Sequence, residues 1–202
     1  MGWLNKLFTK RKNNTNKVFE TSGQYMPNLK IPADEKFTIY FKKNGGKFIY
    51  CEDFAEIQEA LGYIISENQW QDKLFYTIDS QINEQFSSQK ISFTNNLKQG
   101  NIFFTSCEHL VADNGSILVC SHQIKNKKVN ELPDNLIVFA TTSQLVNSIS
   151  DGLKIIKQKY PNQIPDNITS LKNFGHSEEY DNDFLSYGSI PKNLYLLLME
   201  DY

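Results

Sequence analysis

Apolar and polar residues follow two different periods along most of this chain, from about residue 33 onward. Two segments place apolar residues three or four positions apart, which is typical of an amphipathic helix: 52–70 and 143–160. Around them lie short apolar runs, most of them too apolar to leave one face in water, which indicates buried strands: 74–78, 90–93, 101–106, 116–121, 135–140, 167–171 and 193–199. The second helix is expected to begin at a capping Ser143 and to stop before Pro161.

The segment 33–51 fits two patterns. Phe37, Ile39 and Phe41 alternate as in a strand, but Phe37 and Phe41 also have helical spacing, so a hairpin and a helix followed by a strand are both open. We favour the helix, with Asp34 as its N-cap and a Gly-Gly pair at its end, followed by the strand KFIYC at 47–51.

Strands that alternate with helices of this length predict the fold class. We expect an α/β protein in which residues 31–202 form a single three-layer domain with a mainly parallel sheet, covered on both faces. In such sheets ligands bind at the carboxyl ends of the strands.

Residues 1–30 differ in kind from the rest of the chain. Apolar Trp3, Leu4, Leu7 and Phe8 precede Lys10, Arg11, Lys12 and a polar run. A helix of about two turns is marginal in water, and the starts of chains are often poorly ordered. We expect a basic, flexible tail, while docking onto a partner or onto the chain's own domain, and contact with an anionic membrane surface, remain open.

The composition of the chain limits which classes of partner and cofactor are expected. Lys and Arg total 21 against 23 Asp and Glu, giving a net charge of −2, so no nucleic acid partner is expected. No apolar run approaches the roughly 18 residues of a membrane span. The 3 cysteines form no C-x-x-C pair, which argues against a disulfide framework and against an iron–sulfur cluster held by this chain alone. We expect a cytoplasmic protein without a cofactor.

The stretch LVADNGSILVCSH, residues 110–122, contains the strongest local signal. Asn-Gly between alternating apolar residues predicts a tight hairpin turn. Asp113 and Ser116 bracket that turn with a carboxylate and a hydroxyl, and backbone amides at a glycine turn can also hold an anion. A structural turn and a ligand-binding loop that includes Asn114 and Gly115 are therefore both possible.

Two C-x-H pairs flank the same turn, Cys107 with His109 and Cys120 with His122. Two thiols and two imidazoles match a ligand set that zinc accepts. However, the two pairs lie at different distances from the turn, so a tetrahedron would need a bent hairpin, and no metal is expected. No P-loop, dinucleotide-binding or zinc-protease motif is present either.

His176 and Ser177 open a second polar cluster that continues through Glu178, Glu179 and Asp181. A histidine near carboxylates can serve as a general base. A charged stretch between two strands is more often a solvated loop or helix face.

Four segments resemble the LUD-domain family, the lactate-utilization protein C group, in order and spacing: CEHLVADNGSILV, LPDNLIVFATTSQLVNSISDGLKIIK, PDNITSL and IPKNLYLLLMED. The family's Ala-(Glu/Asp)-Thr-Gly-(Ser/Thr) turn corresponds here to Ala112-Asp113-Asn114-Gly115-Ser116. The resemblance covers residues 33–202. It implies a fold similar to the sugar-phosphate isomerase, CoA-transferase and formyltetrahydrofolate cyclo-ligase domains, and an accessory role in L-lactate oxidation beside separate iron–sulfur partner proteins.

The chain departs from the family before its last strand. Typical members carry Gly-Pro-Ser-Arg-Thr-Ala-Asp-Ile-Glu where this chain has Asn-Phe-Gly-His-Ser-Glu-Glu-Tyr-Asp at 173–181. An arginine fork that binds phosphate or carboxylate is thus replaced by His176, which is largely uncharged at neutral pH. Two hypotheses follow. In the first, a small anionic metabolite binds between Asp113, Asn114, Gly115 and Ser116 on one side and His176 and Ser177 on the other. In the second, the chain is a divergent, non-catalytic interaction module.

Overall fold

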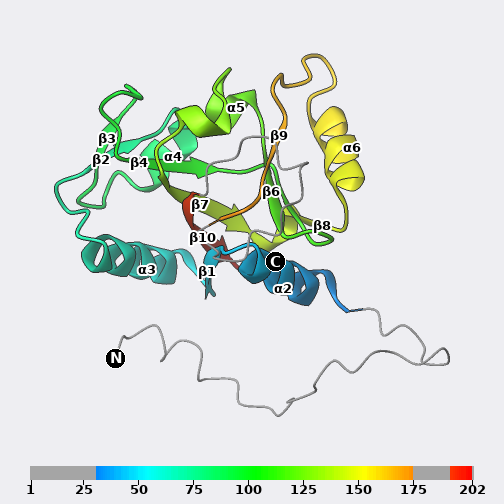
Figure 1. The fold of residues 1–202 in the computed structure, drawn as a ribbon, viewed down its shortest axis with the longest axis horizontal. Coiled ribbons are helices and arrows are strands. Elements are labelled where there is room, and N and C mark those ends of the chain that lie inside the picture. Colours follow the sequence, from blue (N-terminus) through cyan, green and yellow to red (C-terminus); the bar gives the residue numbers. More distant parts are fainter. Residues whose placement is uncertain (1–30, 175–191, 202) are drawn as a thin grey trace, which may run out of the picture. The chain divides into compact units, whose positions relative to one another are not determined.

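A computed structural model describes residues 31–174 and 192–201 of the chain. Its centre is a parallel sheet of 6 strands in the order β1-β10-β7-β4-β2-β3, shown in Figure 1. The strands are β1 (Lys47–Cys51), β2 (Leu74–Tyr76), β3 (Ser92–Thr94), β4 (Ile102–Ser106), β7 (Asn135–Thr141) and β10 (Asn193–Met199). All neighbours in this sheet run parallel, so their carboxyl ends lie along one edge. The mainly parallel sheet expected from the sequence is confirmed.

Helices α3 (Phe54–Glu67) and α4 (Ser80–Gln85) cover one face of this sheet. Phe86, at the end of α4, packs its ring 4.7 Å from that of Phe104 in β4 and 5.6 Å from that of Phe139 in β7. Ile57, Leu61 and Ile64 of α3 are fully buried. Alternate residues of a strand point to opposite faces of the sheet. These contacts therefore identify which alternate residues of β4 and β7 face the helices.

The opposite face packs against α2 (Ala33–Lys43) and a second, smaller sheet. That sheet has the order β8-β5-β6-β9, with β8 (Leu145–Val146), β5 (His109–Val111), β6 (Ser116–Val119) and β9 (Thr169–Leu171). Phe41 of α2, Leu110 of β5 and Ile117 of β6 share one apolar core with Leu136 and Val138 of the parallel sheet. The arrangement is therefore the three-layer α/β domain that the sequence predicts.

Helix α6 (Ile149–Lys159) packs on the outer side of the smaller sheet, beside β6 and β8 in Figure 1. Gly152 permits this close approach, because a Cβ there would lie 2.7 Å from the side chain of Leu118. The short helix α5 (Ser121–Ile124) follows β6, and the 3₁₀ turns η1 (Val129–Glu131) and η2 (Thr142–Gln144) flank β7. The C-terminal end of α6 lies near α5, so residues of both helices line the same cavity.

Segment 33–51 is a helix followed by a strand, as favoured from the sequence, but Pro32 rather than Asp34 is the N-cap of α2. The helix expected at 143–160 begins only at Ile149, and Ser148 caps it by accepting a hydrogen bond from the Asp151 amide. Tertiary contacts explain this difference. Ser143 of η2 donates to the Asp201 carboxylate, and the two residues that follow η2, Leu145 and Val146, pair with β5 as strand β8.

Candidate functional site

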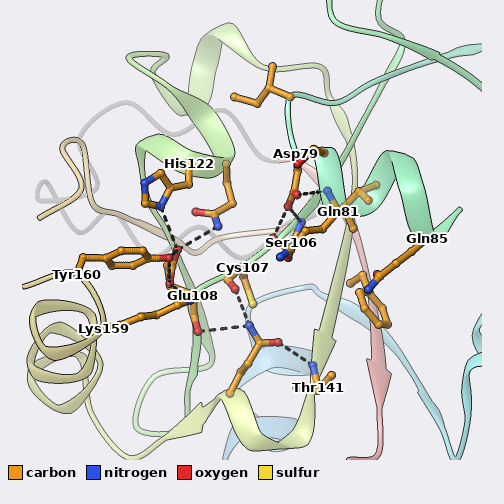
Figure 2. A pocket seen from close by; sticks show the side chains of 16 residues that line it. Asp79, Gln81, Gln85, Ser106, Cys107, Glu108, His122, Thr141, Lys159 and Tyr160 are labelled. Atoms are coloured by element: carbon orange, nitrogen blue, oxygen red, sulfur yellow. Dashed lines mark hydrogen bonds and ion pairs between the residues drawn. The ribbon is translucent and has the colours of Figure 1, made fainter. Parts of the chain in front are cut away.

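A cavity of about 520 Å³ lies at the carboxyl ends of β2, β4 and β7. Side chains from α4, α5, the last turn of α6 and the residues that follow these strands line it, as Figure 2 shows. This is the edge at which open parallel sheets bind their ligands. The lining is largely polar and falls into two groups on opposite sides of the cavity.

The first group, here called the Asp79 corner, consists of Asp79, Ser106 and Gln81. Asp79 follows β2 and caps α4 by accepting from the Gln81 amide at 3.0 Å. Its second carboxylate oxygen accepts from the hydroxyl and the backbone N–H of Ser106, the last residue of β4. These bonds join the ends of β2 and β4 and hold the carboxylate at the cavity wall.

The second group, here called the Glu108 cluster, surrounds a buried carboxylate. Its members are Glu108, Cys120, His122, Gln123, Lys159 and Tyr160. Glu108 lies between β4 and β5, and its side chain is only 1% exposed. Oε2 of Glu108 lies 3.0 Å from the Lys159 ammonium, and Oε1 accepts from the Gln123 amide at 3.1 Å and the Tyr160 hydroxyl at 3.2 Å. The cluster thus ties the start of β5 to α5 and to the end of α6.

These donors determine the charge of the Glu108 cluster. Burial alone raises the pKa of Glu108, but hydrogen bonds from Lys159 and Gln123 outweigh that effect and hold the pKa below its usual value. Burial lowers the pKa of Lys159, but its hydrogen bonds with Tyr160 and Glu108 raise it by more. Both groups therefore carry their charge at neutral pH, and Lys159, 56% exposed, presents an ammonium to the cavity side.

Two buried cysteines belong to this region as thiols, Cys107 in the cavity wall and Cys120 behind it, in contact with Glu108. Burial raises the pKa of Cys107, and it also raises the pKa of Cys120 to about 12. The thiolate is the nucleophilic form, so neither sulfur is activated in this environment. The Cys120 sulfur instead lies 3.1 Å from Oε1 of Gln123 and 3.3 Å from Oε1 of Glu108, the two oxygens to which its thiol can donate.

The Asn-Gly turn predicted from the sequence joins β5 to β6, and its residues lie outside the cavity lining. Gly115 adopts φ +64°, and a Cβ there would lie 2.3 Å from the backbone of α2. Asn114 accepts hydrogen bonds from both the amide and the hydroxyl of Ser116. Exposed Asp113 forms an ion pair with Lys36 of α2.

Three backbone amides of this turn are also occupied. Asp113 donates to the Asn147 carbonyl and Gly115 to the Val111 carbonyl, while the Ser116 amide bonds Asn114. An anion held by these amides would have to replace those bonds, so the contacts favour the structural turn. His176 and Ser177 lie outside the described residues, as do the tail at 1–30 and most of the segment that departs from the family pattern. Ligand binding by the six named residues stays a prediction.

Sequence reasoning named Cys107 and His122 but missed the other residues that line the cavity, although part of the signal was present. Asp79, Ser106 and Thr141 each stand at or just beyond the end of a predicted strand, where a parallel sheet presents its ligand-binding edge. Glu108 was visible only as the middle residue of a C-x-H pair. Lys159 and Tyr160 carried no signal, because 51 residues separate Lys159 from the carboxylate it pairs with.

The two C-x-H pairs are not brought together as one set. Cys120 and His122 face Glu108, whereas His109 turns its Nδ1 toward the Gln144 carbonyl at 3.3 Å, with burial lowering its pKa. The bent hairpin that four ligands would require is absent between β5 and β6, which pair in regular antiparallel register.

Fold and cavity together define a three-layer α/β domain with a polar cavity at the carboxyl edge of its parallel sheet. Residues 35–199 match the LUD domain family, so the chain belongs to this family, which is associated with lactate utilization in general. A search of curated proteins finds no match.

The fold also resembles the crystal structure of a DUF162 family protein from Deinococcus radiodurans, with a TM-score of 0.59 and 13% sequence identity. The match covers 83% of this chain and 96% of that chain. At this identity the likeness concerns the fold alone. Within the described residues, no helix has both the length and the apolar character needed to cross a membrane.

Proposed function

We propose that this protein is a metabolite-binding, accessory component of lactate utilization, and that its ligand is a small anionic metabolite. The observation that carries the proposal is the polar cavity of about 520 Å³ at the carboxyl edge of the parallel sheet. Its volume lies within the range of roughly 300–1,000 Å³ found for small-molecule sites. Family membership supports the link to lactate utilization.

The charges around the cavity support an anionic ligand carrying hydroxyl groups. Both carboxylates already accept hydrogen bonds from the protein, Asp79 from Ser106 and Glu108 from Gln123 and Lys159. The half-exposed Lys159 ammonium has three donor hydrogens and therefore keeps capacity for a carboxylate or phosphate oxygen. The exposed side chain of Gln81 adds amide donors across the cavity.

Ligand-dependent thermal stability tests the proposal. L-lactate, pyruvate, sugar phosphates and CoA esters are added separately, and the midpoint of unfolding is measured. A ligand present at 100 times its dissociation constant stabilises the folded state by about 2.7 kcal/mol. At least one of these anions is expected to raise the midpoint.

Two variants test whether the ligand that raises the midpoint of unfolding binds beside Lys159. Lys159→Met should remove at least 90% of the ligand-induced shift, whereas Lys154→Met, on the exposed side of the same helix, should preserve it. If no anion shifts the midpoint of the wild-type protein, the metabolite-binding function is contradicted and the interaction-module hypothesis is favoured. An equal shift in Lys159→Met would place the ligand elsewhere.

A further inference from the structure

Three side chains of different chemistry converge within the Glu108 cluster. A carboxylate oxygen of Glu108, the thiol sulfur of Cys120 and an imidazole nitrogen of His122 all lie within 4.8 Å of one another. The Cys120 sulfur is 3.3 Å from Oε1 of Glu108, and Nδ1 of His122 is 3.9 Å from the same oxygen. Glu108 precedes β5, while Cys120 and His122 stand at the start of α5, so two segments must fold together to form the set.

Oxygen, sulfur and nitrogen donors in one place suit a borderline-soft cation. Zinc takes carboxylate, thiolate and imidazole ligands, and catalytic zinc sites combine three protein ligands with one open position. We propose that Glu108, Cys120 and His122 bind a zinc ion whose fourth position faces the cavity. This set differs from the Cys-His pairs visible in the sequence, since it uses the second pair and the residue inside the first.

The ligand separations fit a tetrahedral ion with little movement. Metal–ligand bonds of about 2.0–2.3 Å place the ligand atoms of a tetrahedron roughly 3.3–3.7 Å apart. The Cys120 and His122 distances to Glu108 lie close to that range, and the separation between the sulfur and the imidazole nitrogen, at most 4.8 Å, has to shorten by up to about 1.5 Å. His122, with its side chain 50% exposed, is free to make this adjustment and gives the ion a path from solvent.

The surroundings provide the outer contacts that metal ligands usually need. Oε1 of Glu108 faces the sulfur and the imidazole and also accepts from the Tyr160 hydroxyl at 3.2 Å, while Oε2 accepts from Lys159 at 3.0 Å. Gln123 donates to Oε1 and accepts from the backbone amide of Cys120. Hydrogen bonds of this kind orient ligating carboxylates and support metal affinity. The ion pair with Lys159 therefore orients Glu108 without using the oxygen that faces the other two ligands.

Binding must release a proton, because Cys120 is a thiol in the absence of metal. The Zn–S bond forms as the S–H bond breaks, the proton passes to solvent, and no redox step is involved. Affinity for the ion is therefore expected to fall as the pH is lowered. The proposal does not depend on the anionic metabolite, since it concerns the metal alone.

Cobalt and zinc titrations of the full-length protein, stripped of metal with a chelator that is then removed, test the site. One Co²⁺ per chain should bind and produce the near-ultraviolet thiolate-to-cobalt band together with the visible bands of tetrahedral cobalt. Zinc should then displace cobalt, since Zn²⁺ binds such sites more tightly. Absence of the thiolate band in the wild-type protein would overturn the proposal.

Three variants assign the ligands. His122→Ala changes a half-exposed side chain and should weaken cobalt binding at least tenfold, and Cys120→Ser should abolish the thiolate band. Cys51→Ser removes another buried thiol, in β1, and should leave both affinity and spectrum unchanged. Circular dichroism of each metal-free variant establishes that it is folded. A band that survives in folded Cys120→Ser, or unchanged affinity in His122→Ala, would refute the assignment.

Discussion

Glu108 is the residue whose environment most constrains the cavity. Its side chain is almost fully buried, yet it remains charged because Lys159, Gln123 and Tyr160 all donate to it. The two partners of the ion pair differ in exposure, since the Lys159 side chain is 56% exposed. Removing the lysine and removing the glutamate should therefore lower the free energy of unfolding by different amounts.

Lys159→Met should destabilise the protein by about 3 kcal/mol, because it leaves a buried carboxylate without its cation. Glu108→Gln should cost only about 1 kcal/mol, since the lysine can turn into water and a hydrogen bond is the main loss. Urea unfolding measures both free energies. Lys154→Met removes an exposed pair with Asp151 on the same helix and should change stability by less than about 0.5 kcal/mol. Equal costs for Lys159→Met and Glu108→Gln would contradict the described asymmetry.

The same ion pair predicts a dependence of stability on pH. The folded-state pKa of Glu108 is depressed, so its contribution is present at neutral pH and is lost as the pH falls below the ordinary glutamate range of about 4. The folded-state pKa of Lys159 is raised, so its contribution is present at neutral pH and is lost only at alkaline pH, above about 10.

Urea unfolding over a series of acidic pH values measures the Glu108 contribution. In Lys159→Met the folded-state pKa of Glu108 should rise, which removes the difference in proton binding between the unfolded and folded states, so stability should fall less with acidification than in the wild-type protein. In Lys154→Met the profile should follow that of the wild type. Coincident acid limbs for Lys159→Met and wild type would show that this pair does not govern the dependence.

At the scale of elements, apolar runs predicted most strands of the parallel sheet, because β4, β7 and β10 are buried on both faces and leave no room for polar alternation. The start of α6 could not be predicted in the same way. Leu145 and Val146 fit a helical spacing but pair with β5, a contact set by a strand more than 30 residues earlier. The smaller sheet was therefore only partly visible, through the Asn-Gly hairpin.

The turn in that hairpin is held against α2 by Gly115. Gly115→Ala should lower stability by about 2 kcal/mol or more, since alanine is strained at φ +64° and its Cβ would meet the backbone of Tyr40 and Phe41. Gly62→Ala is a matched control, because this exposed glycine of α3 has open space around it and the change should stabilise by about 0.5–1 kcal/mol. Thermal unfolding compares the two, and a neutral Gly115→Ala would contradict a structural role for the turn.

At the scale of the whole molecule, the sequence predicted the edge of the sheet at which the cavity lies but few of the side chains that line it. The rule for parallel sheets points to strand carboxyl ends, and Asp79 and Ser106 lie there. Contacts between distant segments assemble the rest: the β5–β6 hairpin brings His122 to Glu108, and α6 brings Lys159 and Tyr160. Such contacts depend on helix placement, which periodicity alone does not specify.

Backbone amide chemical shifts, recorded by NMR with and without the most stabilising anion, test the central claim that the cavity is the ligand site. The account predicts the largest changes at residues 78–82, 106–108, 122–123 and 159–160, which line the cavity. Residues 113–116, in the hairpin turn, should change little. Changes concentrated in 113–116, with none around the cavity, would contradict it.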